Sequence, residues 1–349
     1  MSHIYNSILE TIGHTPMVAL RNVTKGSPHQ FFAKVEYFNP GGSIKDRVAV
    51  AMIEEAERRG DLKPGGTIIE ATSGNTGVGL ALVGAVKGYK CIFVMPEKMS
   101  EEKRAILRAY GAQVVITPMV GPEDPMSHYS VAKKIAEATP GGFLVNQFFN
   151  PDNWERHFRT TAPEIWEQMD GQIDLLVGGA GTGGTLSGCA RYLKEKNPQI
   201  KVICADPVGS ILYDLYYHKK IVDPPGPYMV EGIGEDMLPG NVHMDVYDGF
   251  VRVTDPEAFA MTRRLVAEEG ILVGPSSATA LVGAVKASQE MTKPSRIVVI
   301  FADSGRQYLS KAFNDQWMIQ KGLIKAEAVK NSFNKVVRAE DALKDLSIK

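Results

Sequence analysis

The sequence predicts an α/β protein with two lobes, each built on a mostly parallel sheet that carries helices on both faces. Short apolar runs alternate with segments of helical periodicity along most of the chain. Such alternation is typical of parallel strands joined by crossover helices. The alternation breaks at residues 145–153 and then resumes. Because 349 residues are enough for about two domains, we interpret this break as the crossing between two lobes.

The first half of the chain has the clearest pattern. Its apolar runs are bounded by polar or glycine-rich turns, as expected for buried strands, and the segments between them have the period of amphipathic helices. We expect strands at residues 31–38, 67–72, 91–96 and 114–118, and helices at residues 48–60, 78–88 and 100–111.

The second half repeats this pattern around one irregular segment. Residues 212–239 contain four prolines and three glycines, and a loop of this length inside a compact domain is typically functional. We expect strands at residues 173–179, 202–206 and 297–303, and a helix that ends near residue 196. We assign residues 46–150 to a smaller mobile lobe, residues 1–45 and 151–322 to a larger lobe, and residues 323–349 to a helical tail or linker.

Composition narrows the class of protein. The net charge of -1 gives no reason to expect a nucleic-acid or membrane partner, and no apolar run approaches the roughly 20 residues of a membrane span. Three scattered cysteines do not form a disulfide framework, which favours a cytoplasmic location. No metal is expected, because the histidines and cysteines lack the spacings typical of metal sites.

Polar, glycine-rich turns follow several of the expected strands, and ligands of open α/β sheets bind at such strand ends. The first turn, Ser-Gly-Asn-Thr-Gly, occupies residues 73–77. It opens a helix whose free N–H groups and dipole suit a carboxylate. The same residue types also serve as an ordinary helix N-cap.

A second turn, Gly-Thr-Gly-Gly-Thr, occupies residues 181–185. Its glycines allow a phosphate to approach the backbone closely. Gly179, Gly181 and Gly184 also match the dinucleotide-binding fingerprint, and Asp206 ends a strand about 20 residues later. A nicotinamide site is therefore an open alternative at this point.

The third turn, Gly-Pro-Ser-Ser at residues 274–277, is also compatible with a simple helix cap. Lys45 lies in residues 39–47, Asn-Pro-Gly-Gly-Ser-Ile-Lys-Asp-Arg, at the start of an expected helix. A helix N-terminus disfavours a cation, which lowers the pKa of a lysine and makes it a better nucleophile. A phosphate loop, a carboxylate loop and such a lysine together fit an aldehyde cofactor with a phosphate, bound as a Schiff base. We expect Asp46 and Arg47 to form a local ion pair.

These motifs, in this order and spacing, resemble those of the cysteine synthase and cystathionine β-synthase family of fold-type II pyridoxal-phosphate enzymes, which share the tryptophan synthase β-like fold. The similarity covers roughly residues 5 to 322. The cystathionine β-synthase branch is favoured by further segments, at residues 33–47, 94–104, 205–212, 230–239 and 311–318.

The resemblance implies a role for each motif. Lys45 is implied as the catalytic lysine that bonds to pyridoxal 5'-phosphate, and the larger lobe as the one that binds the phosphate. Asn75 would bond the phenolic oxygen of the cofactor, and Ser276 would face its pyridine nitrogen. The phosphate loop is implied at Gly181, Thr182, Gly183, Gly184 and Thr185. The substrate carboxylate site is implied at Thr72, Ser73, Gly74, Thr76 and Gln147.

The implied reaction replaces the β-substituent of an amino acid. We expect L-serine or O-acetylserine to react with L-homocysteine to give L-cystathionine, with side reactions that form H2S. Gly232 and Glu235, in the acidic loop at residues 231–236, would then bind the second substrate. Open alternatives are a cysteine synthase that uses sulfide and a binding protein without catalysis.

The resemblance also implies assembly and cofactor content. We expect a homodimer that acts on small amino-acid and thiol substrates. We expect no haem, because nothing before residue 5 could hold one. The sequence departs from the family at Ala278, where the family usually has glycine, and at residues 301–306, Phe-Ala-Asp-Ser-Gly-Arg.

Overall fold

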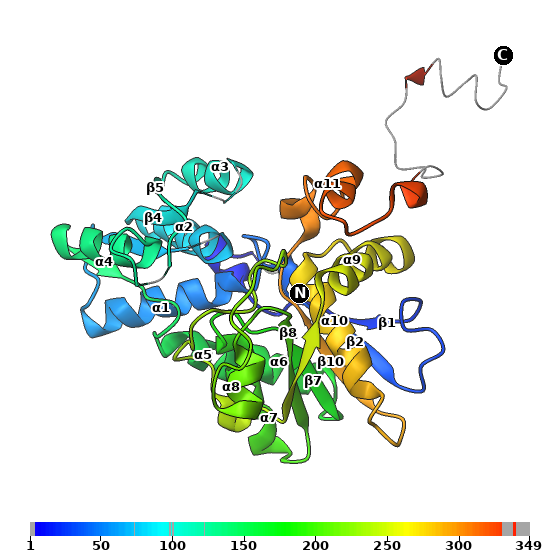
Figure 1. The fold of residues 1–349 in the computed structure, drawn as a ribbon. Helices are drawn as coiled ribbons and strands as arrows, with labels where there is room; N and C mark the ends of the chain where they lie inside the picture. Colours follow the sequence, from blue (N-terminus) through cyan, green and yellow to red (C-terminus); the bar gives the residue numbers. More distant parts are fainter. Residues whose placement is uncertain are drawn as a thin grey trace.

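The computed structural model describes residues 4–72, 74–97, 99, 101–121, 123–329 and 338–339. Two sheets organise the described residues, and they lie in separate parts of the molecule (Figure 1). The four-stranded part, mostly cyan, lies at the upper left of Figure 1, and the six-stranded part fills the centre and lower right.

The six-stranded sheet has the strand order β1-β2-β10-β7-β8-β9. All of its neighbouring strands are parallel except β1, which pairs antiparallel with β2. The central strands are buried on both faces, as expected for a parallel sheet covered by helices. The bounds are β1 Met17–Leu20, β2 Gln30–Val35, β7 Leu175–Gly178, β8 Lys201–Pro207, β9 Gly249–Val253 and β10 Arg296–Phe301.

Alternate residues of these strands enter two different cores. Leu175 and Val177 pack with α9 and α10 on one face, whereas Leu176 packs with α6 and α7 on the other. This is the period-two alternation of a strand with two buried faces. The helices of this part are α5 Asp152–Arg156, α6 Ala162–Gln168, α7 Gly184–Lys196, α8 Leu212–His218, α9 Asp255–Glu269, α10 Pro275–Ser288 and α11 Asp315–Gln320, with a π-helical turn at His157–Thr161 between α5 and α6.

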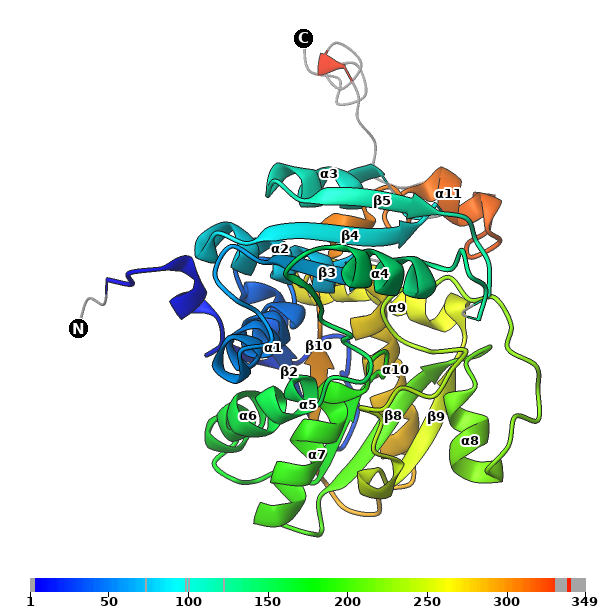
Figure 2. The same cartoon turned by 90° about the vertical axis from the view of Figure 1, so that its left-hand side faces the viewer.

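The four-stranded sheet is entirely parallel and has the order β5-β4-β3-β6. Helices α1, α2 and α3 share a core with one face of this sheet, and α4 packs on the other face, as Figure 2 shows from the side. The bounds are α1 Lys45–Arg59, β3 Thr67–Ala71, α2 Asn75–Lys87, β4 Lys90–Pro96, α3 Glu101–Ala109, β5 Gln113–Thr117, α4 His128–Ala138 and β6 Gly142–Leu144.

Short 3₁₀ helices complete the described secondary structure. They lie at Ile8–Thr11, Glu36–Phe38, Met244–Val246, Gly305–Tyr308 and Ala326–Val329. Within the described residues, no helix is both long enough and apolar enough to span a membrane.

The expected elements exist, but several boundaries were wrong. The expected strand at residues 31–38 ends at Val35, and the helices expected at 48–60 and 78–88 begin at Lys45 and Asn75. The sequence pattern missed β1, β6 and β9, and it missed α8 inside the segment at 212–239. The assignment of lobes to residues 46–150 and the remainder stays a prediction. The helix expected in the tail at 323–349 falls mostly outside the described residues.

Candidate active site

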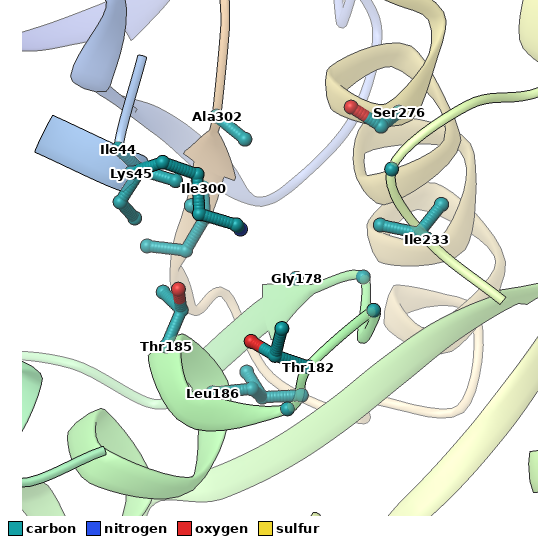
Figure 3. A pocket seen from close by; sticks show the side chains of 14 residues that line it. Ile44, Lys45, Gly178, Thr182, Thr185, Leu186, Ile233, Ser276, Ile300 and Ala302 are labelled. Carbon is teal, nitrogen blue, oxygen red and sulfur yellow. The ribbon is translucent and has the colours of Figure 1, made fainter. Parts of the chain in front are cut away.

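One cavity brings together the turn after β7, the end of β10, the start of α10, the loop at Gly232 and the start of α1. It encloses about 470 Å³ of space, part of it open to solvent. Figure 3 shows Lys45, Thr182, Thr185 and Ser276 arranged around it. The carboxyl ends of β7 and β10 meet at this cavity, as the general rule for ligand sites in open parallel sheets predicts. The lining residues are Ile44, Lys45, Gly178, Gly179, Gly181, Thr182, Gly183, Thr185, Leu186, Gly232, Ile233, Ser276, Ile300 and Ala302.

Lys45 is the first residue of α1, and its side chain reaches into the cavity (Figure 3). Burial lowers the pKa of Lys45, and the nearby carboxylates of Asp303 and Glu235 oppose this effect only in part. A lower pKa leaves more of the amine neutral, which is the form that acts as a nucleophile and as a base. The sequence argument attributed this pKa shift to the helix N-terminus, whereas burial is the main cause here.

The turn before Lys45 is fixed by side chains that bond its backbone. Asp46 accepts a hydrogen bond of 2.6 Å from the amide of Gly41. A Cβ at Gly41 would overlap the carboxylate of Asp46, so this position requires glycine. Asn39 donates 3.1 Å to the carbonyl of Ser43. Burial raises the pKa of Asp46 to about 7, although the hydrogen bond from Gly41 opposes the shift.

The expected ion pair between Asp46 and Arg47 was wrong. Arg47 binds Glu36 and Glu164 instead, each at 2.7 Å. Adjacent residues of a helix do not face each other, so Asp46 and Arg47 point to different neighbours. Burial raises the pKa of Glu164, but hydrogen bonds and charge from Arg47 and Lys34 outweigh it and hold that pKa at about 2.

The loop at residues 181–185 connects β7 to α7, which begins at Gly184. Gly183 has a φ of 85°, a conformation that favours glycine. A Cβ at Gly181 would come within 2.5 Å of the carbonyl oxygen of Gly232. The loop therefore has a bare backbone at the positive end of a helix dipole, and such an arrangement suits a phosphate.

Two polar side chains support this loop, and sequence reasoning missed both. Asn153 donates 3.1 Å to the hydroxyl of Thr182. His157 lies with Nε2 at 3.2 Å from the hydroxyl of Thr185. Neither residue belongs to a recognisable motif, and their sequence separation from the loop gives no local signal.

The turn at residues 73–77 lies beside the cavity rather than among its lining residues. Ser73 is outside the described residues. The hydroxyl of Thr72 accepts hydrogen bonds of 3.2 Å from the amides of Gly74 and Gly77. The hydroxyl of Thr76 donates 2.5 Å to Oε1 of Gln147. The structure thus joins Gln147 to the turn at residues 73–77, although 71 positions separate it from Thr76.

Glu70 lies buried beneath this loop. It accepts a hydrogen bond of 2.7 Å from the amide of Asn146 and a longer one from the amide of Gln147. Burial raises the pKa of Glu70 to about 8, although these hydrogen bonds oppose the shift. Asn146 has a φ of 55°, so a buried carboxyl group holds the strained end of the crossing segment.

Asn75 bonds a residue that the sequence analysis had not assigned to the site. Its Nδ2 donates 2.8 Å to Oδ2 of Asp303, which also accepts 2.8 Å from the hydroxyl of Tyr308. Burial raises the pKa of Asp303, and the bonds from Asn75 and Tyr308 oppose this. The signal that could have revealed Asp303 is its position just after β10, at the same sheet edge as Gly181.

The acidic loop at residues 231–236 closes one side of the cavity through Gly232. Glu231 forms ion pairs with Lys103 of α3 and with Lys311. Glu235 lies near Lys45, and burial, followed by the charge of Asp236, raises the pKa of Glu235 to about 8. The loop therefore places the carboxyl group of Glu235 close to Lys45, whereas that of Glu231 pairs with two other lysines.

Ser276 is buried at the second position of α10 and lines the cavity. Its hydroxyl is neutral, so it can donate or accept a hydrogen bond without supplying a charge. Ala278 lies inside α10 and is fully buried. The helix needs no unusual backbone freedom there, which accounts for alanine at this position.

The residues around the cavity fit pyridoxal phosphate. Gly181 and Gly183 line the cavity without side chains, so the backbone of the loop at 181–185 is accessible to a phosphate. Among the described residues, Asn75 Oδ1 and Asp303 Oδ1 are buried polar atoms without a hydrogen-bond partner. Buried polar groups normally have partners, so a polar ligand would satisfy this part of the site.

The nicotinamide alternative fails on geometry. Asp206 would have to face the loop at 181–185 to bind a ribose. Instead its carboxylate accepts a hydrogen bond of 3.0 Å from the amide of Tyr213, in the first turn of α8. Burial is the main cause that raises the pKa of Asp206 to about 6. Asp206 therefore serves as a buried support for α8.

Known proteins resemble this chain over most of its length. Residues 8–303 match the family described as pyridoxal-phosphate dependent enzyme. The cystathionine beta-synthase of Oryctolagus cuniculus is 49% identical over 93% of this chain and 59% of its own length. The cysteine synthase of Staphylococcus aureus (strain N315) is 44% identical over 87% of this chain and 96% of its own length.

A solved structure is similar as well. The O-acetylserine dependent cystathionine beta-synthase from Helicobacter pylori has a TM-score of 0.82 and 40% identity, over 89% of this chain and 99% of that protein. The chain spans about three fifths of the length of the mammalian relatives. The glycine-lined cavity with Lys45, the family match and these relatives lead to one conclusion: the chain belongs to the pyridoxal-phosphate-dependent enzymes of fold type II.

Proposed function

We propose that this enzyme catalyses β-replacement, in which L-serine or O-acetylserine reacts with L-homocysteine to give L-cystathionine. The observation that carries the proposal is the cavity lining, in which Lys45 lies with Thr182, Thr185, Ser276 and Gly232. Such a site has a base, an anion cradle and a neutral ring partner. When bound there, pyridoxal phosphate withdraws electrons from the α-carbon of the substrate.

In the proposed mechanism, Lys45 would hold the cofactor through its side-chain amine until the substrate binds. This amine then takes the α-proton of the substrate and later returns it to the product. Its lowered pKa supports this role, because an amine must be unprotonated to accept a proton. Lys45 acts on one carbon from a fixed position at the start of α1.

Other residues hold the groups around that carbon. Thr72, Gly74, Thr76 and Gln147, together with Ser73, are proposed to bind the α-carboxylate of the substrate. The bond between Thr76 and Gln147 supports this, since both side chains can turn from each other toward a carboxylate. Asn75 is proposed to bond the phenolic oxygen of the cofactor, which fits its Nδ2, since this group has a second N–H besides the one that it donates to Asp303.

Ser276 is proposed to face the pyridine nitrogen. A neutral hydroxyl does not hold that nitrogen protonated as a carboxylate would. The electron withdrawal is therefore limited, which favours prompt loss of the β-substituent over racemisation or transamination. The smaller lobe, residues 46–150, is proposed to close over the site and exclude water.

The choice of homocysteine rests on the acidic loop. Homocysteine has a charged ammonium group that sulfide lacks, and the carboxyl groups of Glu235, which lies near Lys45, and of the adjacent Asp236 are proposed to receive it. The relative from Helicobacter pylori is named as an O-acetylserine dependent cystathionine beta-synthase, which supports the same pair. Gly232 leaves room beside the cavity for the second substrate.

A comparison of kcat/KM tests the substrate pair. Each serine donor is combined with homocysteine or sulfide, in the wild type and in Glu235→Ala and Asp236→Ala. We expect a preference for homocysteine that at least one substitution reduces by roughly tenfold, the effect of losing about 1.4 kcal/mol of binding. A preference for sulfide that neither substitution changes would assign the enzyme to the cysteine synthases.

The cysteine synthase reaction is the second candidate. It is favoured by the Staphylococcus aureus cysteine synthase, which this chain matches along nearly its whole length. Side reactions that form H2S are also proposed, since a hydrogen sulfide-producing enzyme from Fusobacterium nucleatum is 37% identical with a TM-score of 0.81. We further propose a cytoplasmic homodimer that acts on small molecules and has no nucleic-acid or membrane partner. Light scattering of the purified protein tests the dimer.

A further inference from the structure

The loop at residues 181–185 rests on one short segment that carries two buried polar side chains. Asn153 lies in α5, and His157 begins the π-helical turn that follows. Both are buried, with 1% of their surface exposed. π-helical turns occur frequently at functional sites, and here the turn directs a side chain toward the loop.

The bond from Asn153 fixes the direction of the Thr182 hydroxyl. Nδ2 of Asn153 donates both to Oγ1 of Thr182, at 3.1 Å, and to the carbonyl oxygen of Gln147, at 2.9 Å. A carbonyl oxygen only accepts, so the orientation of this amide is determined. A threonine hydroxyl has a single proton. Because Thr182 accepts from Asn153, that proton is left to donate to another group, and Thr182 lines the cavity.

His157 can do the same for Thr185 in one of its two tautomers. Its Nδ1 lies 2.8 Å from the hydroxyl of Thr161, and its Nε2 lies 3.2 Å from the hydroxyl of Thr185. Burial, followed by the charges of Arg47 and Lys45, lowers the pKa of His157 well below its usual value. The ring is therefore neutral and carries one proton.

The tautomer of His157 decides whether the hydroxyl of Thr185 offers a proton or only lone pairs to an anion in the cavity. If Nε2 carries the proton, it donates to Thr185, whose own proton is then free to point into the cavity. Nδ1 accepts from Thr161 in that case. If Nδ1 carries the proton, Thr185 donates to Nε2 and turns only lone pairs toward the anion, which is repulsive. An anion in the cavity is thus compatible with the Nε2–H tautomer.

We propose that Asn153 and His157 are positioning residues that orient the hydroxyls of Thr182 and Thr185 as donors to the cofactor phosphate. The inference rests on the proposed assignment of residues 181–185 as the phosphate loop. Asn153 and His157 do not touch the phosphate themselves. Their effect is to remove the orientational freedom of two hydroxyls before the ligand arrives, so that both donate without rearrangement.

The test compares pyridoxal 5'-phosphate with pyridoxal, which lacks the phosphate. Dissociation constants of both are measured by fluorescence for the apoprotein of the wild type and of Thr185→Val, His157→Leu and His157→Gln. A residue that acts through the phosphate changes only the dissociation constant of pyridoxal 5'-phosphate. A residue that merely supports the fold changes both, so the ratio of the two constants separates the two roles.

We expect Thr185→Val to weaken pyridoxal phosphate roughly 10- to 100-fold, the effect of losing a hydrogen bond to a charged group. His157→Leu should weaken it roughly tenfold, since Thr185 keeps its proton but not its direction. His157→Gln should recover most of this loss, because its amide can replace Nε2–H. In a Thr185→Val background, His157→Leu should have no further effect on the ratio.

The failures are distinguishable. If Thr185→Val leaves the ratio unchanged, the phosphate loop assignment itself is wrong. If Thr185→Val weakens the binding of pyridoxal 5'-phosphate relative to pyridoxal but His157→Leu does not, only the positioning role is overturned. Should His157→Leu fail to fold, nitrogen NMR of the wild type labelled at histidine still decides the question. The Nε2–H tautomer of His157 supports the proposal, and the Nδ1–H tautomer refutes it.

Discussion

Two neighbouring loops at the active-site cavity are held in different ways. In the proposed phosphate loop, Thr182 and Thr185 are supported by buried neutral side chains from a segment that packs against α7. In the acidic loop, Glu231 joins Lys103 of the four-stranded part to Lys311 of the six-stranded part by ion pairs. The first arrangement is fixed by the packing of one sheet, whereas the second is formed between the two parts.

This difference fits the different residence times of the two kinds of ligand. A cofactor stays bound through many turnovers, so a rigid site improves its affinity by removing ordering costs. Substrates must enter and leave, and partly exposed ion pairs can open with a small free-energy change. The comparison leads to four predictions, from the largest expected effect to the smallest.

The largest effect is expected at Lys45, which lines the same cavity. Lys45→Ala should remove the visible absorbance of the lysine-bound cofactor. It should also reduce turnover by about three orders of magnitude or more, since the proton-transfer group is lost. Circular dichroism should show an intact fold. Normal activity with an absorbance that persists would show that another lysine has this role.

Ser276→Asp changes the charge of the residue that is proposed to face the ring nitrogen of the cofactor. A carboxylate at this position would keep the pyridine nitrogen protonated and prolong the carbanion. We expect the rate of β-replacement to fall by more than about tenfold, with a new long-wavelength absorbance. Ser276→Ala is the matched control, and it should have a smaller effect. Wild-type rates in Ser276→Asp would exclude the role at the ring nitrogen.

Glu231→Gln weakens the contact between the two parts. Loss of both ion pairs should change KM for the amino-acid donor by about two- to tenfold, with little change in the affinity for pyridoxal phosphate. Glu55→Gln is a suitable control, since it removes an exposed ion pair with Arg58. A loss of cofactor affinity in Glu231→Gln would contradict the proposal that the acidic loop and the loop at residues 181–185 serve different ligands.

The smallest effect is on stability and concerns Glu70. Its pKa rises from 4.5 to about 8 on folding, with burial as the main cause. The unfolded chain therefore releases this proton at lower pH, and stability falls as pH rises from about 4.5 to 8. Glu70→Gln removes this pH-dependent loss of stability, because glutamine does not ionise. We expect the melting temperature of the variant relative to the wild type to rise by about 2–4 °C between pH 5 and 8. An unchanged difference across this range would show that Glu70 is not protonated on folding.

The sequence predicted the alternating fold well because buried parallel strands leave a strong local signal. Strands β3, β4, β7 and β8 lie within two residues of their expected positions. The helices α1 and α2 began earlier than expected, since their first turns consist of the polar and glycine residues of the site. The missed strands β1, β6 and β9 lie at sheet edges and are only partly buried, so they lack the continuous apolar runs of β3 and β7.

The site was predicted where chemistry depends on local motifs and missed where it depends on distant neighbours. Lys45, Thr182 and Ser276 come from turns that the sequence identifies, and they line one cavity. Arg47 was misjudged because its partner Glu164 is 117 positions away. His157 lies on no motif, and only the packing of its segment against α7 brings it to Thr185.

The pairing of β2 with β10 has a consequence for how this protein is made. Gln30 aligns with Arg296, so β2 cannot pair with β10 until the ribosome has added the residues between them. At about 5–20 residues per second, that wait is between roughly ten seconds and one minute. The four-stranded sheet needs nothing beyond Leu144 and can form during this time. The larger sheet, and with it the cavity, can be completed only after Phe301 at the end of β10 has been added, so the smaller sheet has time to fold first.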